Sequence, residues 1–168
     1  MSWKIELLGA GMLDSVAGFR NQATVENFNA FAEASKRYFD LLRGQLSAMP
    51  PGARVFAESY VFGDVHSKAL HDEEVTDIQI KESSAEGLFD ISILVTTKEV
   101  QNSGANLLRI NYQSVSAWQI IDSRDSLLIC TNEIMLAGNG IQHTIHLFGD
   151  PPIKILCADL DAELVSRQ

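Results

Sequence analysis

The segment Gly63–Glu74, "GDVHSKALHDEE", holds two histidines and four carboxylates, more chemically capable side chains than any stretch of similar length. Imidazole and carboxylate groups are the usual ligands of zinc and the usual groups for proton transfer. His66 and His71 are five residues apart, which separates them by roughly 140° on a helix and puts them on opposite faces of a strand. We therefore interpret the segment as a polar loop and predict no metal site.

The three carboxylates directly after His71 form an acidic cluster together with Asp77. Most charge runs are solvated edges, and this is one interpretation of the cluster. The other is half of an electrostatically steered interface with a basic partner. The cluster that would form this partner-binding patch is Asp72, Glu73, Glu74 and Asp77.

A second group of candidate residues lies where "CTNEIML" faces "IQHTIHLF" across Asn139-Gly140. A two-residue type I′ turn at this Asn-Gly pair predicts that Glu133 pairs with His146 and Leu136 with His143. A four-residue loop would shift the partners by two and keep the same faces. His143 and His146 have an odd spacing, so they point to opposite faces of one strand.

Glu133 beside His146 is either a general-base pair or an ordinary cross-strand contact. No GxSxG elbow, CxxC or Cys–His arrangement accompanies it, so we predict no catalytic residue and no cofactor. The alternative is a small-molecule-binding or hydrolytic barrel-like domain in which at least one of these three side chains lines an enclosed pocket. Its candidate residues are Glu133, His143 and His146.

Gly9-Ala10-Gly11 follows an apolar run, as in the opening of a dinucleotide-binding loop. Asp14 stands where the third glycine would be, and no alternating strand–helix pattern follows. The segment is better explained as a turn after an N-terminal strand. Glu6 interrupts the apolar run, so we expect neither a signal peptide nor a membrane span.

The composition is that of a soluble globular protein, with 168 residues, 46% hydrophobic residues and a formal net charge of −9. No basic stripe is present, so we expect no nucleic-acid binding. An acidic chain favours a basic macromolecular partner. Cys130 and Cys157 lie in apolar runs, on opposite faces of the predicted sheet, with Cys157 on the face of His146. They indicate core residues in a reducing compartment, the cytoplasm.

One helix is predicted from Thr24 to Met49, with Thr24 as its N-cap and Pro50-Pro51-Gly52 as its stop. Glu33 and Arg37 are spaced to pair on its exposed side. Its apolar stripe consists of Phe28, Phe31, Tyr38, Phe39, Leu42, Leu46 and Met49.

After residue 53 the periodicity becomes alternating and predicts consecutive antiparallel strands separated by short turns. A further strand, Trp3–Leu8, precedes the helix. The predicted strands are Arg54–Phe62, Val75–Lys81, Leu88–Thr97, Asn106–Tyr112, Val115–Ile121, Leu127–Leu136, Ile141–Phe148 and Ile153–Ala158.

These elements predict a single α+β domain over 1–168, with an N-terminal strand and loop over 1–23. One long helix over 24–49 packs on a curved, mostly antiparallel sheet over 53–160. We expect about six to eight strands in a meander, rolled toward a half-barrel or a small sandwich.

Residues 70–163 carry the segments "LHDEEVTDIQI", "LLRINYQSVSAW", "GNGIQHTIHLF" and "IKILCADLDAE". This order resembles a loosely defined group of small bacterial proteins of unknown function. The group has no established activity, so the resemblance implies none here; some similarly short bacterial proteins are immunity factors that cap a toxin. The matching positions are Leu70, His71, Asp72, Glu133, Gly140, His143 and Asp159.

We therefore expect a non-enzymatic protein that binds another protein, with inhibition of a basic toxin or nuclease as the most concrete version. The enzyme or small-molecule-binding alternative stays open. A third hypothesis is a homo-oligomeric module that buries exposed apolar positions of the sheet between subunits, namely Met135, Phe148 and Ile155.

Overall fold

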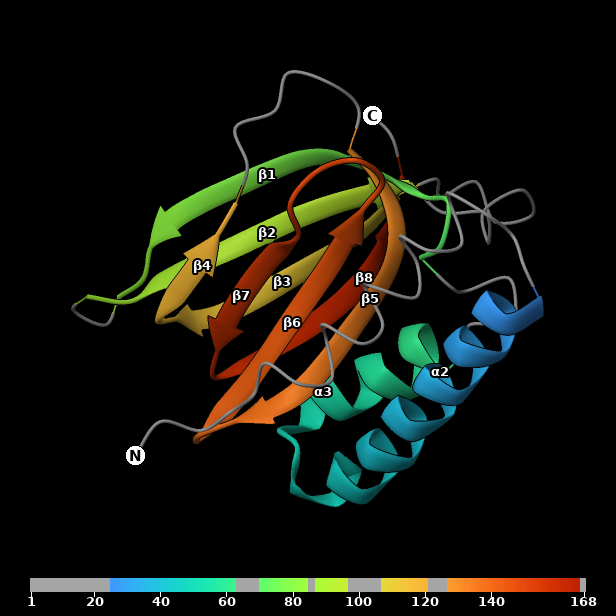
Figure 1. Cartoon of the computed structure of the whole chain (residues 1–168). Coiled ribbons are helices and arrows are strands. Elements are labelled where there is room, and N and C mark those ends of the chain that lie inside the picture. The colour runs from blue at the N-terminus through green and yellow to red at the C-terminus, as the bar shows by residue number, and fades with distance from the viewer. Residues whose placement is uncertain (1–24, 63–69, 85–86, 97–106, 121–126, 167–168) are drawn as a thin grey trace. The chain divides into compact units, whose positions relative to one another are not determined.

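The computed structural model of the chain describes residues 25–62, 70–84, 87–96, 107–120 and 127–166 (Figure 1). Three predicted features lie outside the described residues: the strand Trp3–Leu8, the Gly9–Gly11 turn and His66. The chain divides into two compact units, Met1–Gly44 and Gln45–Gln168, and each is described by itself. A single domain stays a prediction, as does the packing of the first helix on the sheet. No helix among the described residues is long and apolar enough to cross a membrane.

Helix α2 spans Val25–Gln45 and ends earlier than predicted. Tyr38 and Leu42, four residues apart on the apolar stripe, are both buried, as this spacing on one helix face requires. A 3₁₀ turn, η1, follows over Leu46–Ala48, and Met49 is extended at φ −70° and ψ 148°. The reason is the diproline, because the residue before a proline is driven out of the helical region.

The predicted strand Arg54–Phe62 is wrong, since the structure has helix α3 at Pro51–Phe56 and a π-helical turn, η2, at Ala57–Val61. Proline is compatible with the first turn of a helix, so Pro51 begins α3 where we expected only a stop. The buried residues Ala53, Phe56, Ala57 and Val61 are three or four positions apart or adjacent, which is helical spacing.

Asp159 fastens α3 to the far end of the chain. Its carboxylate accepts hydrogen bonds from the backbone N–H of Ala53 at 2.8 Å and of Gly52 at 3.2 Å. These are first-turn donors that the helix itself cannot satisfy. Gly52 lies so close to the strand that a Cβ there would overlap the carbonyl oxygen of Leu160.

The described chain is mainly one antiparallel sheet of eight strands with short helices, so its class is sheet-rich, where the sequence predicted α+β. The strand order is β4-β7-β6-β5-β1-β2-β3-β8. The strands are β1 Glu74–Glu82, β2 Phe89–Thr96, β3 Leu107–Val115, β4 Ala117–Gln119, β5 Leu127–Ala137, β6 Gly140–Leu147, β7 Ile153–Cys157 and β8 Asp159–Val165.

The meander holds within two groups of three strands, β1-β2-β3 and β5-β6-β7, which a short β1–β5 pairing joins. It fails after β3 and after β7, where the chain bends and crosses to the other group. β4 therefore pairs with β7, and β8 pairs with β3. The N–H of Ser116 donates to Leu156 and that of Ala158 donates to Gln113, which ties the two bends together. Figure 1 shows the resulting curvature, with β1-β2-β3 facing β7-β6-β5.

The core fills the space between the two strand groups. Inward positions alternate along each strand, as the pleat requires. They are almost entirely aliphatic, and the exceptions on these strands, Tyr112, His143 and Cys157, are polar or polarizable. The inward set is Ile91, Ile93 and Val95 on β2, Leu108, Ile110 and Tyr112 on β3, Ile141, His143 and Ile145 on β6, and Ile153, Ile155 and Cys157 on β7.

The β5–β6 hairpin differs from the prediction by two residues. Ala137 pairs with Gly140, so the two-residue turn is Gly138-Asn139 and not Asn139-Gly140. Gly138 supplies the positive φ of 61°. Gly140 is the first residue of β6, and a side chain there would not fit, because a Cβ would overlap the carbonyl oxygen of Cys157.

The predicted face of Cys157 is also wrong. Cys157 pairs with Ile141 and therefore shares the inward face of His143, while His146 points to the other face. The predicted face assumes continuous alternation from β6 to β7, but an irregular loop over residues 149–152 interrupts it. Cys130 and Cys157 are not joined by a disulfide, and burial together with Asp159 raises the pKa of Cys157 to about 12.

Candidate functional site

His143 lies in the core and is fixed from two sides. The hydroxyl of Tyr112 on β3 is 2.7 Å from its Nδ1, and Oδ1 of Asn132 on β5 is 3.3 Å from its Nε2. The ring of Phe56 from α3 contacts it edge to face, with ring centroids 5.0 Å apart. All of these side chains are buried.

This arrangement selects one tautomer of the imidazole. The amide oxygen of Asn132 only accepts, so Nε2 carries the proton and donates it. Nδ1 is then the acceptor, and the hydroxyl of Tyr112 is its donor. Burial raises the pKa of Tyr112 well above 10.0, which keeps that hydroxyl protonated. Both ring nitrogens are thereby occupied.

Burial, with a smaller contribution from His146, lowers the pKa of His143 from 6.5 to about 3. A protonated ring would have to place a charge in the apolar core, which is costly. His143 is therefore neutral at physiological pH. With both nitrogens hydrogen-bonded inside the core, it acts as a structural residue and is not positioned to exchange protons with a substrate.

Glu133 and His146 lie on the opposite face of the β5–β6 hairpin from His143. Their Oε2 and Nε2 atoms are 3.5 Å apart, and their side chains are 9% and 4% exposed. The actual register places Glu133 opposite Thr144 and His146 opposite Thr131, so the pair is diagonal. The three predicted pocket residues consequently do not converge on one cavity.

The acidic cluster is split by burial. Asp72 and Asp77 are exposed and Glu74 is half-buried, but Glu73 is 4% exposed. Its Oε2 accepts a hydrogen bond from the hydroxyl of Thr96 at 2.9 Å. A surface made from this cluster thus contains at most three of its four carboxylates.

His71 is exposed, and its Nδ1 lies 3.0 Å from Oδ1 of Asp72. Asp72 adopts φ 62°, and its N–H donates to the carbonyl of Ile129, while the N–H of Ile129 donates to Glu73. The backbone of this turn therefore extends the β1–β5 pairing. Among the described residues, no three His, Cys, Asp or Glu side chains are grouped so that they could hold a metal ion.

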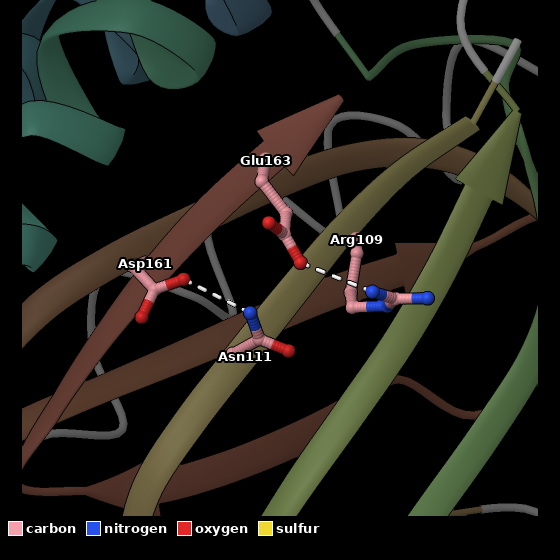
Figure 2. Close-up of polar contacts among 4 residues, drawn as sticks. All are labelled: Arg109, Asn111, Asp161 and Glu163. Atoms are coloured by element: carbon pink, nitrogen blue, oxygen red, sulfur yellow. Dashed lines mark hydrogen bonds and ion pairs between the residues drawn. The ribbon is translucent and has the colours of Figure 1, made fainter. Parts of the chain in front are cut away.

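A polar face that the sequence did not single out runs along β3 and β8. Glu163 accepts from Nη1 of Arg109 at 3.1 Å, and Asp161 accepts from the amide of Asn111 at 2.9 Å (Figure 2). Asp161 also accepts from the amide of Gln113 at 3.1 Å. We call these five residues the polar ladder. They alternate along "RINYQ" and "DAE", but the last predicted strand ends at Ala158, so the pairing of β3 with β8 was not predicted.

A groove of about 470 Å³ lies beside the polar ladder, on the outward side of β1, β2 and β3. The outward side chains along this groove are polar, and Ile91 and Tyr112 contribute from positions whose side chains point inward. The outward lining residues are Gln79, Lys81, Asp90, Ser92, Asn111, Gln113 and Ser114.

The homo-oligomer hypothesis has one residue corrected. Ile155 is completely buried within the core, so it cannot form part of an exposed apolar interface. Met135 and Phe148 are half-buried. Oligomerisation stays a prediction.

The fold and these surfaces define a sheet-rich protein with a structural histidine inside and a carboxylate-bearing polar face outside. No family model, curated protein or solved structure matched the chain. The resemblance of residues 70–163 to small bacterial proteins therefore stays a prediction. Two of its positions have clear structural roles here, because Gly140 permits close strand packing and Asp159 caps α3.

Proposed function

We propose that this chain is a non-enzymatic protein that binds another protein with a basic surface, using the outward side of β1, β2, β3 and β8. The most concrete version is a bacterial, cytoplasmic immunity protein that inhibits a basic toxin or nuclease. The buried, doubly hydrogen-bonded state of His143 supports a non-enzymatic role. The remaining candidate pair, Glu133 and His146, is buried on the other face of its hairpin.

The observation that carries the proposal is the polar ladder. Asp161 and Glu163 are exposed, yet both carboxylates are held by hydrogen bonds from residues of the neighbouring strand. Groups that are already ordered lose less conformational entropy when they bind a partner. The ladder therefore offers preorganised acceptors on a rigid sheet, and such acceptors suit the Lys and Arg side chains of a basic surface.

The charge of this face also supports binding to a basic protein. Carboxylates outnumber cations on it, and the whole chain carries a formal net charge of −9. Such a surface attracts a cationic protein over distances on the order of the Debye length, about 8–10 Å at physiological salt. The outward charged residues are Asp77, Asp90, Asp161 and Glu163 against Lys81 and Arg109.

Affinity capture from lysate of the source cells tests the proposal. The tagged chain is used at low and at moderate salt, beside two variants with the same change in net charge. The ladder variant is Asp161→Asn with Glu163→Gln. The control is Glu33→Gln with Glu58→Gln, two exposed carboxylates on α2 and η2.

The wild type and the control are expected to recover the same basic protein at low salt, and less of it at moderate salt. The ladder variant is expected to recover less at both. Recovery of no protein, or recovery that ignores ionic strength, contradicts an electrostatic interface.

A further inference from the structure

We propose that the groove on β1, β2 and β3 is the subsite that receives an arginine side chain of the partner, with Asp90 as its counter-ion. This inference rests on the proposed function, because it names the chemistry by which the same face recognises a basic protein. The volume of the groove, about 470 Å³, lies in the range typical of ligand pockets, about 300–1,000 Å³.

A β-bulge gives the groove its shape. Phe89 pairs with Val115 and Ile91 with Tyr112, so Asp90 alone faces two residues of β3. One of these, Ser114, has φ 53° and donates its N–H to Oδ1 of Asp90 at 3.1 Å. The extra residue lies on β3, and a bulge bends its strand and redirects its groups. Here it brings the N–H of Ser114 to the carboxylate of Asp90, which lines the groove.

Hydrogen bonds to neighbouring carboxylates fix the orientation of three side-chain amides. Asp161 accepts hydrogen bonds from Nδ2 of Asn111 and Nε2 of Gln113, and Asp77 accepts one from Nε2 of Gln79 at 2.8 Å. A carboxylate can only accept, so each amide must turn its nitrogen toward it and its oxygen away. Figure 2 shows this for Asn111, whose amide oxygen lies on the side opposite Asp161.

The groove is thereby rich in acceptors, and Lys81 is the cation among its lining residues. The carboxylate of Asp90 lines it together with the amides of Gln79, Asn111 and Gln113, each of which has one of its two N–H donors bound to a carboxylate beside the groove. A ligand that brings donors and a positive charge complements the carboxylate of Asp90 and the amide oxygens. The guanidinium group has five N–H donors in a plane, has no acceptor and stays protonated, so it matches better than an ammonium group or a neutral amide.

Lys81 gives the proposal a second, opposite prediction. Lys81 on β1 lies directly opposite Asp90 on β2 in the strand register, and it lines the same groove. Its ammonium group repels an incoming guanidinium and competes for Asp90. Removing the two charges should therefore change arginine binding in opposite directions, which a general loss of folding cannot do.

The test is a ¹H–¹⁵N NMR titration of the full chain with N-acetyl-arginine amide. N-acetyl-citrulline amide has the same shape without the charge, and N-acetyl-lysine amide carries the charge without the planar fork. We expect saturable shifts centred on Gln79, Ser92, Asn111 and Gln113, with a dissociation constant on the order of 10 mM for one side chain. Lysine amide should bind more weakly, and citrulline amide should not saturate.

Asp90→Asn keeps the oxygen that accepts from Ser114 and removes only the charge, so it should weaken arginine binding about threefold. Lys81→Ala should strengthen it about twofold. Absence of saturable shifts, equal binding of citrulline, or shifts outside these strands overturns the groove assignment. If the arginine titration shows no such binding while the affinity capture still depends on charge, the partner binds another part of the face. If arginine binds and no partner is captured, the groove assignment stands and the proposed function fails.

Discussion

The hydroxyl of Tyr112 on β3 lies 2.7 Å from Nδ1 of His143 on β6 and donates a hydrogen bond to it across the core. This bond joins the β1-β2-β3 group to the β5-β6-β7 group through the core, in addition to the short β1–β5 pairing and the backbone hydrogen bonds at the two bends. A buried bond of this kind specifies one arrangement, because either partner left alone would be an unsatisfied polar group in an apolar interior.

Tyr112→Phe removes the donor and leaves Nδ1 of His143 buried without a partner. The free energy of unfolding should fall by about 1–3 kcal/mol, the usual cost of an unsatisfied buried acceptor. Urea unfolding measures it. In a double-mutant cycle with His143→Phe, the tyrosine change should cost much less, since the acceptor is gone. Equal costs in both backgrounds would show that this hydrogen bond contributes nothing.

The low pKa of His143 predicts acid destabilisation. Its ordinary value is 6.5, and in the folded chain it is about 3, so the unfolded state binds a proton first as the pH falls. The associated stability is present above pH 6.5 and is lost progressively toward pH 3, by at most about 1.4 kcal/mol per pH unit.

Urea unfolding between pH 7 and pH 4 should show a steeper loss for the wild type than for His143→Gln, which has no titrating group there. Long-range ¹H–¹⁵N spectra of the imidazole should show the neutral Nε2–H tautomer down to at least pH 5. A ring that protonates near pH 6.5, or the opposite tautomer, would refute the assigned hydrogen bonds.

Gly140→Ala should destabilise the chain, because the added Cβ would overlap the carbonyl oxygen of Cys157. Moving backbone apart in a packed sheet costs about 1–3 kcal/mol. Gly44→Ala is the matched control, since nothing lies within 4 Å of its Cβ position on α2. That control should be stabilising by about 0.5–1 kcal/mol. A neutral Gly140→Ala in thermal unfolding would show that the strands are not so closely packed.

Asp159→Ala removes the cap of α3, whose first-turn N–H groups of Gly52 and Ala53 bond to that carboxylate. The expected loss is about 0.5–2 kcal/mol. Glu58→Ala, at an exposed position of η2, should change stability by no more than about 0.5 kcal/mol. Amide hydrogen exchange of α3 should accelerate in the first variant only. Unchanged exchange would mean that the helix does not depend on this cap.

Alternation along the chain predicted most of the sheet because its strands bury one face, which leaves a period of two in the sequence. β5 and β6 were located within a few residues for this reason. Helix α3 was missed because "ARVFAESYVF" contains β-branched and aromatic residues throughout, and only burial reveals its helical spacing. The prediction placed Gly140 in the turn because the local pattern does not contain its close contact with Cys157, seventeen positions away.

The candidate site was less accessible to sequence reasoning. Odd spacing predicted that His143 and His146 point to opposite faces, and their pairing in the hairpin has this geometry. The polar ladder depends on β3 meeting β8, whose paired residues Asn111 and Asp161 are 50 positions apart. Charge spacing within either strand gives no sign of that meeting, since it follows from the bends after β3 and β7.

The most direct test of the binding role is the affinity of the captured partner at several ionic strengths. It is measured by biolayer interferometry for the wild type, the ladder variant (Asp161→Asn with Glu163→Gln) and the charge-matched control (Glu33→Gln with Glu58→Gln). We predict that the ladder variant binds about two- to tenfold more weakly with a shallower salt dependence, while the control stays within twofold of wild type. Equal affinities for both variants would contradict recognition through β3 and β8.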